Sequence, residues 1–333
     1  MGADCRTPIA PAALPATFAH NSKQTAMTAV SGSNLEQRLK AGRFVLTAEV
    51  VPPISCESAD LMKKATPLKG VADAVNVTDG AGARAHMSAV ASAKIMQDAG
   101  IEPILQLVCR DRNRIGLQSD LMGASALGIR NLLILGGDKP TAGDQPEAKA
   151  VFDLDSRSLS VTARDIGQGK LPTGTAVLNP HPFFVGAADA PIDPKPDWQP
   201  TGLKGKVDAG GMFAQTQFCM DAGVIRRYVA KLTEAGILPG LYMLIGVNPL
   251  RSAKSGNWMR NNLFGTIIAD SMLERMEKAA DPAAEGRKIC VEYIEELATI
   301  PGIAGVHIMA PGNDAAVPDV INEARSRIAK AKL

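Results

Sequence analysis

Residues 103–138 of the chain read PILQLVCRDRNRIGLQSDLMGASALGIRNLLILGGD, and they carry the pattern that decides the fold. A short apolar run over 103–108 is followed by a helix-length amphipathic stretch over 114–127, and then by a second apolar run over 131–135. Gly128 supplies the left-handed residue that commonly ends a helix before the next strand. This order of strand, helix and strand predicts one βα unit of a parallel sheet.

The same unit recurs along the rest of the chain. Short apolar runs alternate with helix-length stretches from residue 34 onward, and Gly100 and Gly236 again stand at helix ends. The predicted strands are 44–50, 74–78, 103–108, 131–135, 175–178, 212–217, 241–245 and 305–309. The predicted helices are 58–68, 84–99, 114–127, 156–168, 202–209, 221–235, 261–299 and 317–331. Such alternation predicts an α/β fold of the (β/α)8 TIM barrel type, whose usual size of about 250 residues fits this chain.

The barrel is expected to form a single domain over residues 34–333, behind an N-terminal extension over 1–33. The extension is rich in Ala, Thr, Ser and Pro without apolar periodicity, so we expect it to be disordered, with a transit peptide as the alternative. Ser33 and Glu36 have the spacing of a capping box that opens a short helix. A doubly wound open sheet is the alternative architecture, but the G-x-G-x-x-G loop that usually follows its first strand is missing.

Composition argues against several classes of function. The chain is 46% hydrophobic, and 36 Lys and Arg nearly balance 34 Asp and Glu, so we expect no nucleic-acid partner. The longest apolar runs are strand-sized, which predicts no membrane span. The five cysteines are widely separated and the four histidines lack metal-ligand spacing, so we expect no metal site and a reducing, cytoplasmic location.

Chemistry in such a barrel is expected at the carboxyl ends of the strands, and Glu49 lies at the first of them. Thr47 and Glu49 share one side of the first strand, inside otherwise apolar sequence. A carboxylate there is either held ionised by a basic partner, or desolvated enough to carry a proton that it can deliver near neutral pH. Glu49 is therefore a candidate general acid, with a structural ion pair as the alternative.

Other strand ends carry polar side chains that we expect to face the same space. Thr78 ends the second strand on the same side as Asn76, and Asp138 follows two glycines after the fourth strand. Gln217 shares a side of the sixth strand with Gln215. A buried glutamine amide must be hydrogen-bonded, and a planar heterocycle with a donor and an acceptor would satisfy it.

Two further features favour structural interpretations. The charged run CRDRNR at 109–114 follows the third strand and is interpreted as a solvated salt network. His307 lies within an apolar strand, where a histidine is more often a hydrogen-bonded core residue than a ligand.

Taken together, the strand ends resemble those of the methylenetetrahydrofolate reductase family of flavin-dependent (β/α)8 barrels. The resemblance covers residues 34–333 and rests on stretches that stand in family order. They are TAEVVPP at 47–53, VT at 77–78, LGGD at 135–138, KVDAG at 206–210 and TQF at 216–218. The run CRDRNR, followed by LQSDL at 117–121, looks like the branch found beside homocysteine methyltransferases or in one-carbon reductive pathways.

The resemblance implies reduction of 5,10-methylenetetrahydrofolate to 5-methyltetrahydrofolate, as in methionine biosynthesis, by hydride transfer from reduced FAD. It makes Glu49 the general acid that protonates N10 of the folate. It makes Asp138 the charge beside the flavin and the pterin, and Gln217 a hydrogen-bond partner of the pterin. Thr78 and Lys206 match flavin contacts.

The resemblance also assigns the flavin side of the site to positions where this chain departs from better-known members. Gln106 stands where many have histidine, and Gly136 stands where they have arginine. Asn179-Pro180-His181 stands where they have Tyr-Pro-Glu, which makes Asn179 and His181 candidate cofactor contacts.

The electron donor is expected to be NAD(P)H or another reductant, and the partners a folate substrate with either a homo-oligomer or a redox or methyltransferase protein. Two alternatives remain at this point. One is a folate-binding barrel with little FAD that serves as a subunit of a redox complex. The other is a pterin methyltransferase that works with a corrinoid protein.

Overall fold

The computed structural model describes residues 31–331. Most of the predicted disordered extension, residues 1–30, lies outside the described residues. Ser31 is buried, because its N–H and its hydroxyl both donate to the carboxylate of Glu36. Ser33 caps helix α1 (Asn34–Lys40) as predicted by accepting from the Glu36 N–H, but the Glu36 side chain turns to Ser31 and not to Ser33.

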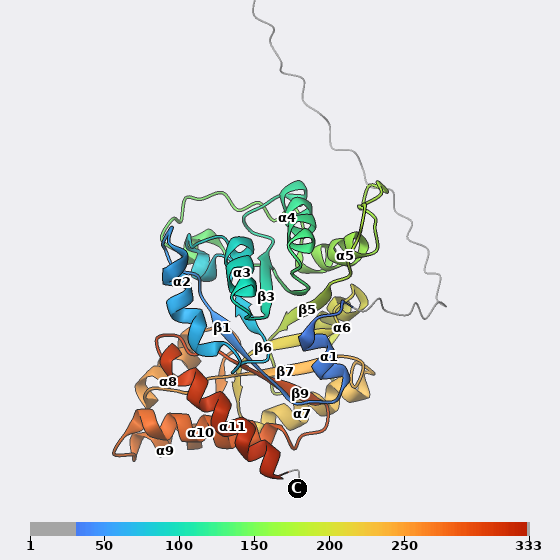
Figure 1. Ribbon diagram of the computed structural model, residues 1–333. Helices are drawn as coiled ribbons and strands as arrows, with labels where there is room; N and C mark the ends of the chain where they lie inside the picture. The colour runs from blue at the N-terminus through green and yellow to red at the C-terminus, as the bar shows by residue number, and fades with distance from the viewer. Residues whose placement is uncertain (1–30, 332–333) are drawn as a thin grey trace, which may run out of the picture.

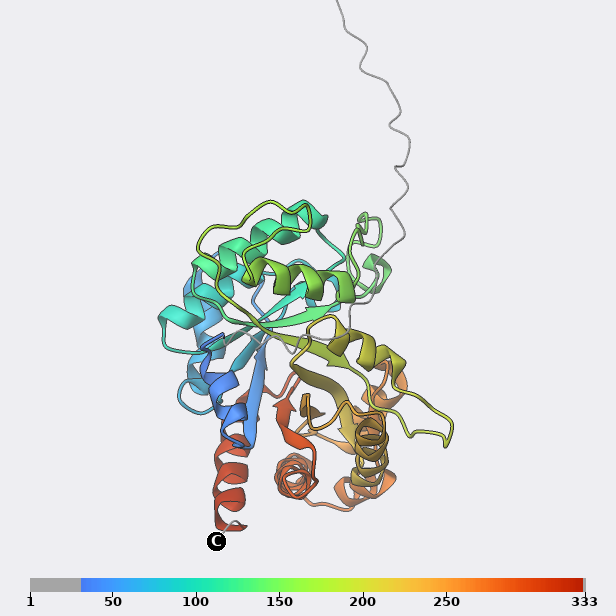
Figure 2. The ribbon, with the colours of Figure 1, turned by 90° about the vertical axis from the view of Figure 1, so that its right-hand side faces the viewer.

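Parallel strands close into a barrel that helices surround (Figures 1 and 2). The strands pair in chain order from β1 to β7, β9 follows β7, and β9 pairs with β1 to close the ring. The strands of the ring are β1 (Val45–Val50), β2 (Val75–Val77), β3 (Pro103–Val108), β4 (Asn131–Leu135), β5 (Phe184–Asp189), β6 (Phe213–Met220), β7 (Tyr242–Val247) and β9 (Ile303–Ile308). The short β8 (Ile267–Ile268) pairs with the end of β6 outside the ring. The predicted (β/α)8 barrel is therefore confirmed.

The outer helices pack their apolar faces against the sheet. They are α2 (Ser58–Ala65), α3 (Ala89–Asp98), α4 (Arg114–Ala126), α5 (Ser156–Gly167), α6 (Thr201–Asp208), α7 (Ala222–Glu234), α8 (Ala253–Asn262), α9 (Asp270–Glu277), α10 (Pro282–Leu297) and α11 (Val317–Ala331). The longer helical region predicted over 261–299 is not continuous, because the end of α8, β8, α9 and α10 divide it. Asp281 caps α10 and Pro282 starts it, so these two residues set one of the breaks.

The interior of the barrel changes from apolar to polar along its axis. At the amino ends of the strands, inward side chains such as Val45 and Leu244 form an apolar cluster with Leu35 and Leu39 of α1. Two residues further along the strands, the inward side chains are polar. This buried polar layer consists of Thr47, Asn76, Gln215 and His307.

The fifth strand predicted at 175–178 is wrong, because β5 spans Phe184–Asp189. Residues 175–178 instead turn back toward the end of α5. The Val177 N–H donates to Gly169 O at 2.8 Å, and the Leu178 side chain is 85% exposed. β5 reads FVGAAD, whose small residues give a weak strand signal. Gly186 is required there, because the ring of Phe213 on β6 fills the space that a side chain would occupy.

Candidate active site

A cavity of about 620 Å³ opens at the carboxyl ends of the barrel strands. Pockets that bind small molecules commonly have volumes of about 300–1,000 Å³, so the cavity has the size of a ligand site. Six of the eight predicted site residues line it. They are Glu49, Thr78, Gln106, Asp138, Lys206 and Gln217.

The structure does not bring Asn179 and His181 into this cavity. Both precede β5, at the amino end of that strand, and both are exposed. Their predicted place followed from the resemblance of Asn179-Pro180-His181 to the Tyr-Pro-Glu stretch of the family, next to the wrongly predicted fifth strand. The residues that reach the cavity from the end of β5 are Ala188, Asp189 and Ala190.

Glu49 lies on the inner face of β1 at the floor of the cavity. Its carboxylate oxygen Oε2 accepts a hydrogen bond from Gln106 Nε2 at 3.1 Å, and His307 Nε2 lies 3.6 Å from the same oxygen. The side chain of Glu49 is 19% exposed, whereas that of His307 is 3% exposed. Within this cluster, Glu49 is therefore the side chain most accessible to a ligand.

Below this carboxylate, the buried polar layer forms one hydrogen-bonded network. Gln215 exchanges two hydrogen bonds with Asn76, at 2.6 and 3.1 Å, and its Nε2 also donates to Thr47 Oγ1 at 3.1 Å. Thr47 Oγ1 in turn lies 3.1 Å from both His307 Nδ1 and Val306 O. Because unpaired buried polar groups are costly, these side chains hold one another in place.

The network also determines where a proton can sit between His307 and Glu49. The single hydrogen of Thr47 Oγ1 goes either to Val306 O or to His307 Nδ1. In the first arrangement His307 Nδ1 either donates to Thr47 or accepts from Gln215 Nε2, which lies 3.4 Å away. In the second arrangement His307 Nδ1 accepts and Nε2 carries the hydrogen. His307 Nε2 therefore faces Glu49 Oε2, at 3.6 Å, as a donor or as an acceptor.

Asp189 is a cavity residue that the sequence did not predict. It ends β5, and the hydroxyl of Tyr228 donates to its Oδ2 at 2.6 Å. Burial raises the pKa of the Asp189 carboxyl, while the Tyr228 bond and the charge of Lys206 oppose that rise. Lys206 Nζ also donates to Ala188 O at 2.6 Å. Correct placement of β5 would have revealed Asp189 as a strand-end carboxylate.

Phe264 is a second cavity residue without a sequence prediction. It follows α8, lines the cavity and is 89% exposed. It lies in an irregular segment, where no alternation of apolar and polar residues marks a side chain as facing the site. An exposed aromatic face beside a cavity is a natural surface for a planar ring.

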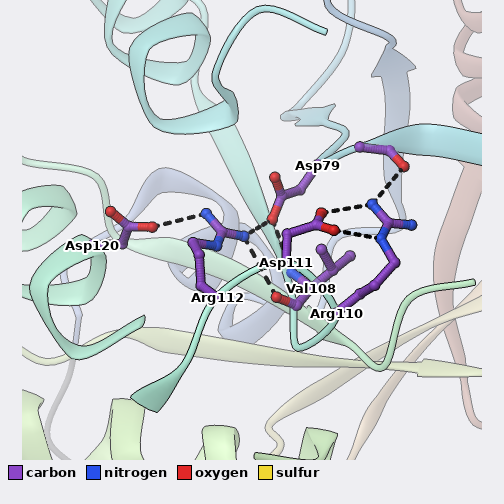
Figure 3. Close-up of polar contacts among 7 residues, drawn as sticks. Asp79, Val108, Arg110, Asp111, Arg112 and Asp120 are labelled. Atoms are coloured by element: carbon purple, nitrogen blue, oxygen red, sulfur yellow. Dashed lines mark hydrogen bonds and ion pairs between the residues drawn. The ribbon is translucent and has the colours of Figure 1, made fainter. Parts of the chain in front are cut away.

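The interpretation of the CRDRNR run as a solvated salt network is wrong for Arg110, whose side chain is 4% exposed and lines the cavity. Figure 3 shows Arg112 on the other side of this segment, paired with Asp79 and Asp120. Asp79 Oδ2 also accepts from the Val108 N–H at 2.9 Å. Burial raises the pKa of the Asp79 carboxyl, and the charge of Arg112 opposes that rise. The run therefore builds part of the cavity wall.

Acidic side chains outnumber basic ones around the cavity. The carboxylates are Glu49, Asp79, Asp138 and Asp189, and the cations are Arg110 and Lys206. Arg110 is already paired with Asp111 through two hydrogen bonds of 2.6 Å. Asp79 is likewise paired with Arg112, and burial raises the pKa of Asp189, so Glu49 and Asp138 are the carboxylates that would favour a transition state that develops positive charge.

Residues 31–331 contain no group of three or more His, Cys, Asp or Glu side chains arranged to hold a metal ion. Over the same part of the chain, no helix combines the length and the apolar character needed to cross a membrane.

The two neighbouring inward glutamines of β6 should differ in what they stabilise. We expect Gln215→Leu to lower the free energy of unfolding by about 1–3 kcal/mol, because Asn76 and Thr47 would lose buried partners. Gln217→Leu, the matched control, should cost less than about 1 kcal/mol, because the Gln217 side chain bonds only the neighbouring Phe218 N–H among the described residues. Urea unfolding measures both values, and equal losses would contradict the role given to the polar layer.

Comparison with known proteins agrees with the barrel fold. The sequence matches the family described as "Methylenetetrahydrofolate reductase" over residues 34–325. It is 22% identical over 242 residues to the "Probable methylenetetrahydrofolate reductase (NADPH)" of Caenorhabditis elegans, covering 69% of this chain and 33% of that protein. It is 29% identical over 199 residues to the "5,10-methylenetetrahydrofolate reductase" of Salmonella typhimurium, covering 59% of each. The chain thus spans from one third to about three fifths of the length of these curated relatives.

A solved structure from Clostridium thermocellum has the same fold. It superimposes with a TM-score of 0.60 at 12% identity, covering 88% of this chain and 98% of that one. That protein is described as an uncharacterized protein that binds two copies of 5-methyl-5,6,7,8-tetrahydrofolic acid. Because the family match extends over most of its length, this chain belongs to the methylenetetrahydrofolate reductase family.

Proposed function

We propose that the protein reduces 5,10-methylenetetrahydrofolate to 5-methyltetrahydrofolate. The observation that carries the proposal is the carboxyl group of Glu49 at the floor of the cavity, hydrogen-bonded by Gln106 and next to His307. The reaction opens a five-membered ring, so it needs an acid at N10 and a group that stabilises the cation formed. Membership of the family supports the same reaction.

Glu49 is the proposed general acid. It is the accessible carboxyl of its cluster, so its proton can pass to N10 of a folate in the cavity. The Gln106 amide then stabilises the carboxylate that remains, because it donates to Oε2. His307, which lies 3.6 Å from that oxygen, is the proposed route by which the proton is restored.

Asp138 is the proposed stabiliser of the cation. It lines the cavity after β4 and belongs to the carboxylates that make the wall acidic. A fixed negative charge near a developing iminium lowers the energy of the transition state more than that of the neutral substrate.

FAD is the proposed source of the hydride, and Thr78 supports its presence. Thr78 Oγ1 is buried at the cavity wall without a hydrogen-bond partner among the described residues, which fits a bound group. Thr78, Gln106, Asp138 and Lys206 are the residues that would hold the flavin. When bound, the flavin supplies a hydride to the methylene carbon, after reduction by NAD(P)H or another donor.

The folate ring is proposed to lie between Gln217 and Phe264. An added Cβ at Gly265 would lie 3.8 Å from Gln217 Cγ, so the Phe264 segment runs next to this glutamine. The ring of Phe264 offers a stacking surface, and the Gln217 amide offers both a donor and an acceptor to a pterin.

We assign the enzyme to the cytoplasm as part of the same proposal. The cysteines Cys56, Cys109, Cys219 and Cys290 are free thiols, as is usual in a reducing compartment.

Substitution of the acid tests the proposed reaction. Glu49→Gln should lower the rate of folate reduction by at least about 100-fold, because an amide cannot donate the proton, while flavin reduction stays within about twofold. Glu57→Gln is the control, because Glu57 is exposed in the segment after β1 and its side chain makes no capping bond. Steady-state and half-reaction kinetics of the three proteins measure the rates. Retained folate turnover in the Glu49→Gln protein would contradict the assignment.

A folate-binding barrel with little FAD, acting as a subunit of a redox complex, is the second candidate. The state of the two cavity cations favours it, because Arg110 is paired with Asp111 and Lys206 Nζ is bonded to Ala188 O. Arg110 therefore offers no uncommitted charge to a phosphate, and the charge of Lys206 is shared with the Asp189 carboxyl, although Lys206 keeps two further N–H donors.

The absorbance of the purified protein distinguishes the two candidates. A flavin spectrum is expected for the first candidate. A colourless protein that still binds 5-methyltetrahydrofolate would support the second candidate and contradict the first.

A further inference from the structure

Arg110 is a buried arginine at the cavity to which the proposed chemistry gives no role. It follows β3, and its Nε and Nη2 each donate to Asp111 at 2.6 Å. Figure 3 shows this ion pair, which takes up two of the N–H groups of the guanidinium. The hydrogen bonds that Arg110 makes to groups other than Asp111 are therefore the ones that can position parts of the site.

Those N–H groups bind two backbone carbonyls on either side of β3. Nη2 of Arg110 donates to Gly80 O at 3.1 Å, in the segment after β2. Nη1 donates to Asp138 O at 3.2 Å, in the segment after β4. One rigid guanidinium thus joins three neighbouring strand ends, because its planar fork fixes both carbonyls together.

The glycines of these segments make room for the guanidinium. A Cβ at Gly80 would overlap Arg110 Nη2, and a Cβ at Gly137 would lie 3.2 Å from Arg110 Cβ. Gly70, before β2, also has a positive φ, and no atom lies within 4 Å of a Cβ added there. Gly70 and Gly80, with φ of +72° and +59°, therefore share the strained backbone, but only Gly80 contacts Arg110 and Asp111.

The backbone at Asp138 sets where its side chain starts. Asp138 is exposed, and within residues 31–331 its carboxylate takes part in no hydrogen bond or ion pair, whereas its carbonyl is bound by Arg110. The main chain that Arg110 holds therefore fixes the position of the Asp138 Cα and the direction of its Cα–Cβ bond, from which the carboxylate reaches the cavity.

We propose that Arg110 is a positioning residue that keeps Asp138 at the cavity wall by binding its backbone carbonyl. The inference rests on the proposed function, in which Asp138 stabilises the cation formed on the folate. The charge of Arg110 also faces Asp138, and Arg110→Lys keeps that charge while it removes the bidentate geometry, so this substitution isolates the contribution of the two carbonyl bonds.

A double-mutant cycle tests whether Arg110 acts through Asp138. Arg110→Lys keeps the charge beside Asp111 but cannot bind both carbonyls, so kcat for folate reduction should fall about tenfold, with KM within about twofold. In the Asp138→Asn background the same substitution should change kcat by less than about twofold. Arg114→Lys is the control and should leave kcat within about twofold of wild type, because Arg114 pairs with Asp153 and is 56% exposed. Equal factors in both backgrounds would overturn the proposal.

Hydrogen exchange tests the same link without any activity measurement. Arg110→Lys, and Gly80→Ala, which displaces the guanidinium, should both speed amide exchange over residues 136–142 by at least about tenfold. Gly70→Ala introduces similar backbone strain away from Arg110 and from residues 136–142, so exchange over 136–142 should match that of wild type. Unchanged exchange in the Arg110→Lys protein would overturn the proposal. If the wild type makes no 5-methyltetrahydrofolate, the proposed function fails, while the exchange rates still decide whether Arg110 holds this segment.

Discussion

Four polar side chains in the middle of an otherwise apolar barrel form hydrogen bonds with one another, and the position of the candidate site depends on these bonds. Gln215 exchanges hydrogen bonds with Asn76, and Thr47 joins this pair to His307. A buried donor or acceptor left without a partner costs about 1–3 kcal/mol, so β1, β2, β6 and β9 are held in one register. Glu49 is two residues beyond Thr47 on β1, and its height at the cavity floor follows from that register.

The apolar layer below this network contributes to stability, and the layer above it forms the candidate site. Below it, Phe184 and Phe213 stack with ring centroids 4.8 Å apart, and Gly186 leaves room for the second ring. Above it, the wall becomes acidic and its segments depend on ion pairs such as Arg110 with Asp111. The packing of the apolar layer is thus separate from the side chains at the strand ends, which form the candidate site.

The alternation of inward and outward side chains along the strands made much of the candidate site predictable. This period of two determines which residues of a strand face inward. It predicted that Thr47 and Glu49 share a side. It failed at β5, whose glycine and alanines look unlike a strand until the Phe213 ring is in place. It also failed for Arg110, because burial of that charge depends on carbonyls contributed by distant segments. Local sequence contains no signal for such contacts.

In the mechanism proposed here, a hydride from reduced flavin reaches the methylene carbon of the folate in this cavity. The most direct test is mass spectrometry of the product formed from 5,10-methylenetetrahydrofolate in heavy water, with FAD and NADH supplied. Because the N5 hydrogen of a reduced flavin exchanges with solvent, we expect 5-methyltetrahydrofolate with one deuterium in its methyl group. A methyl group without deuterium, or no 5-methyltetrahydrofolate at all, would contradict it.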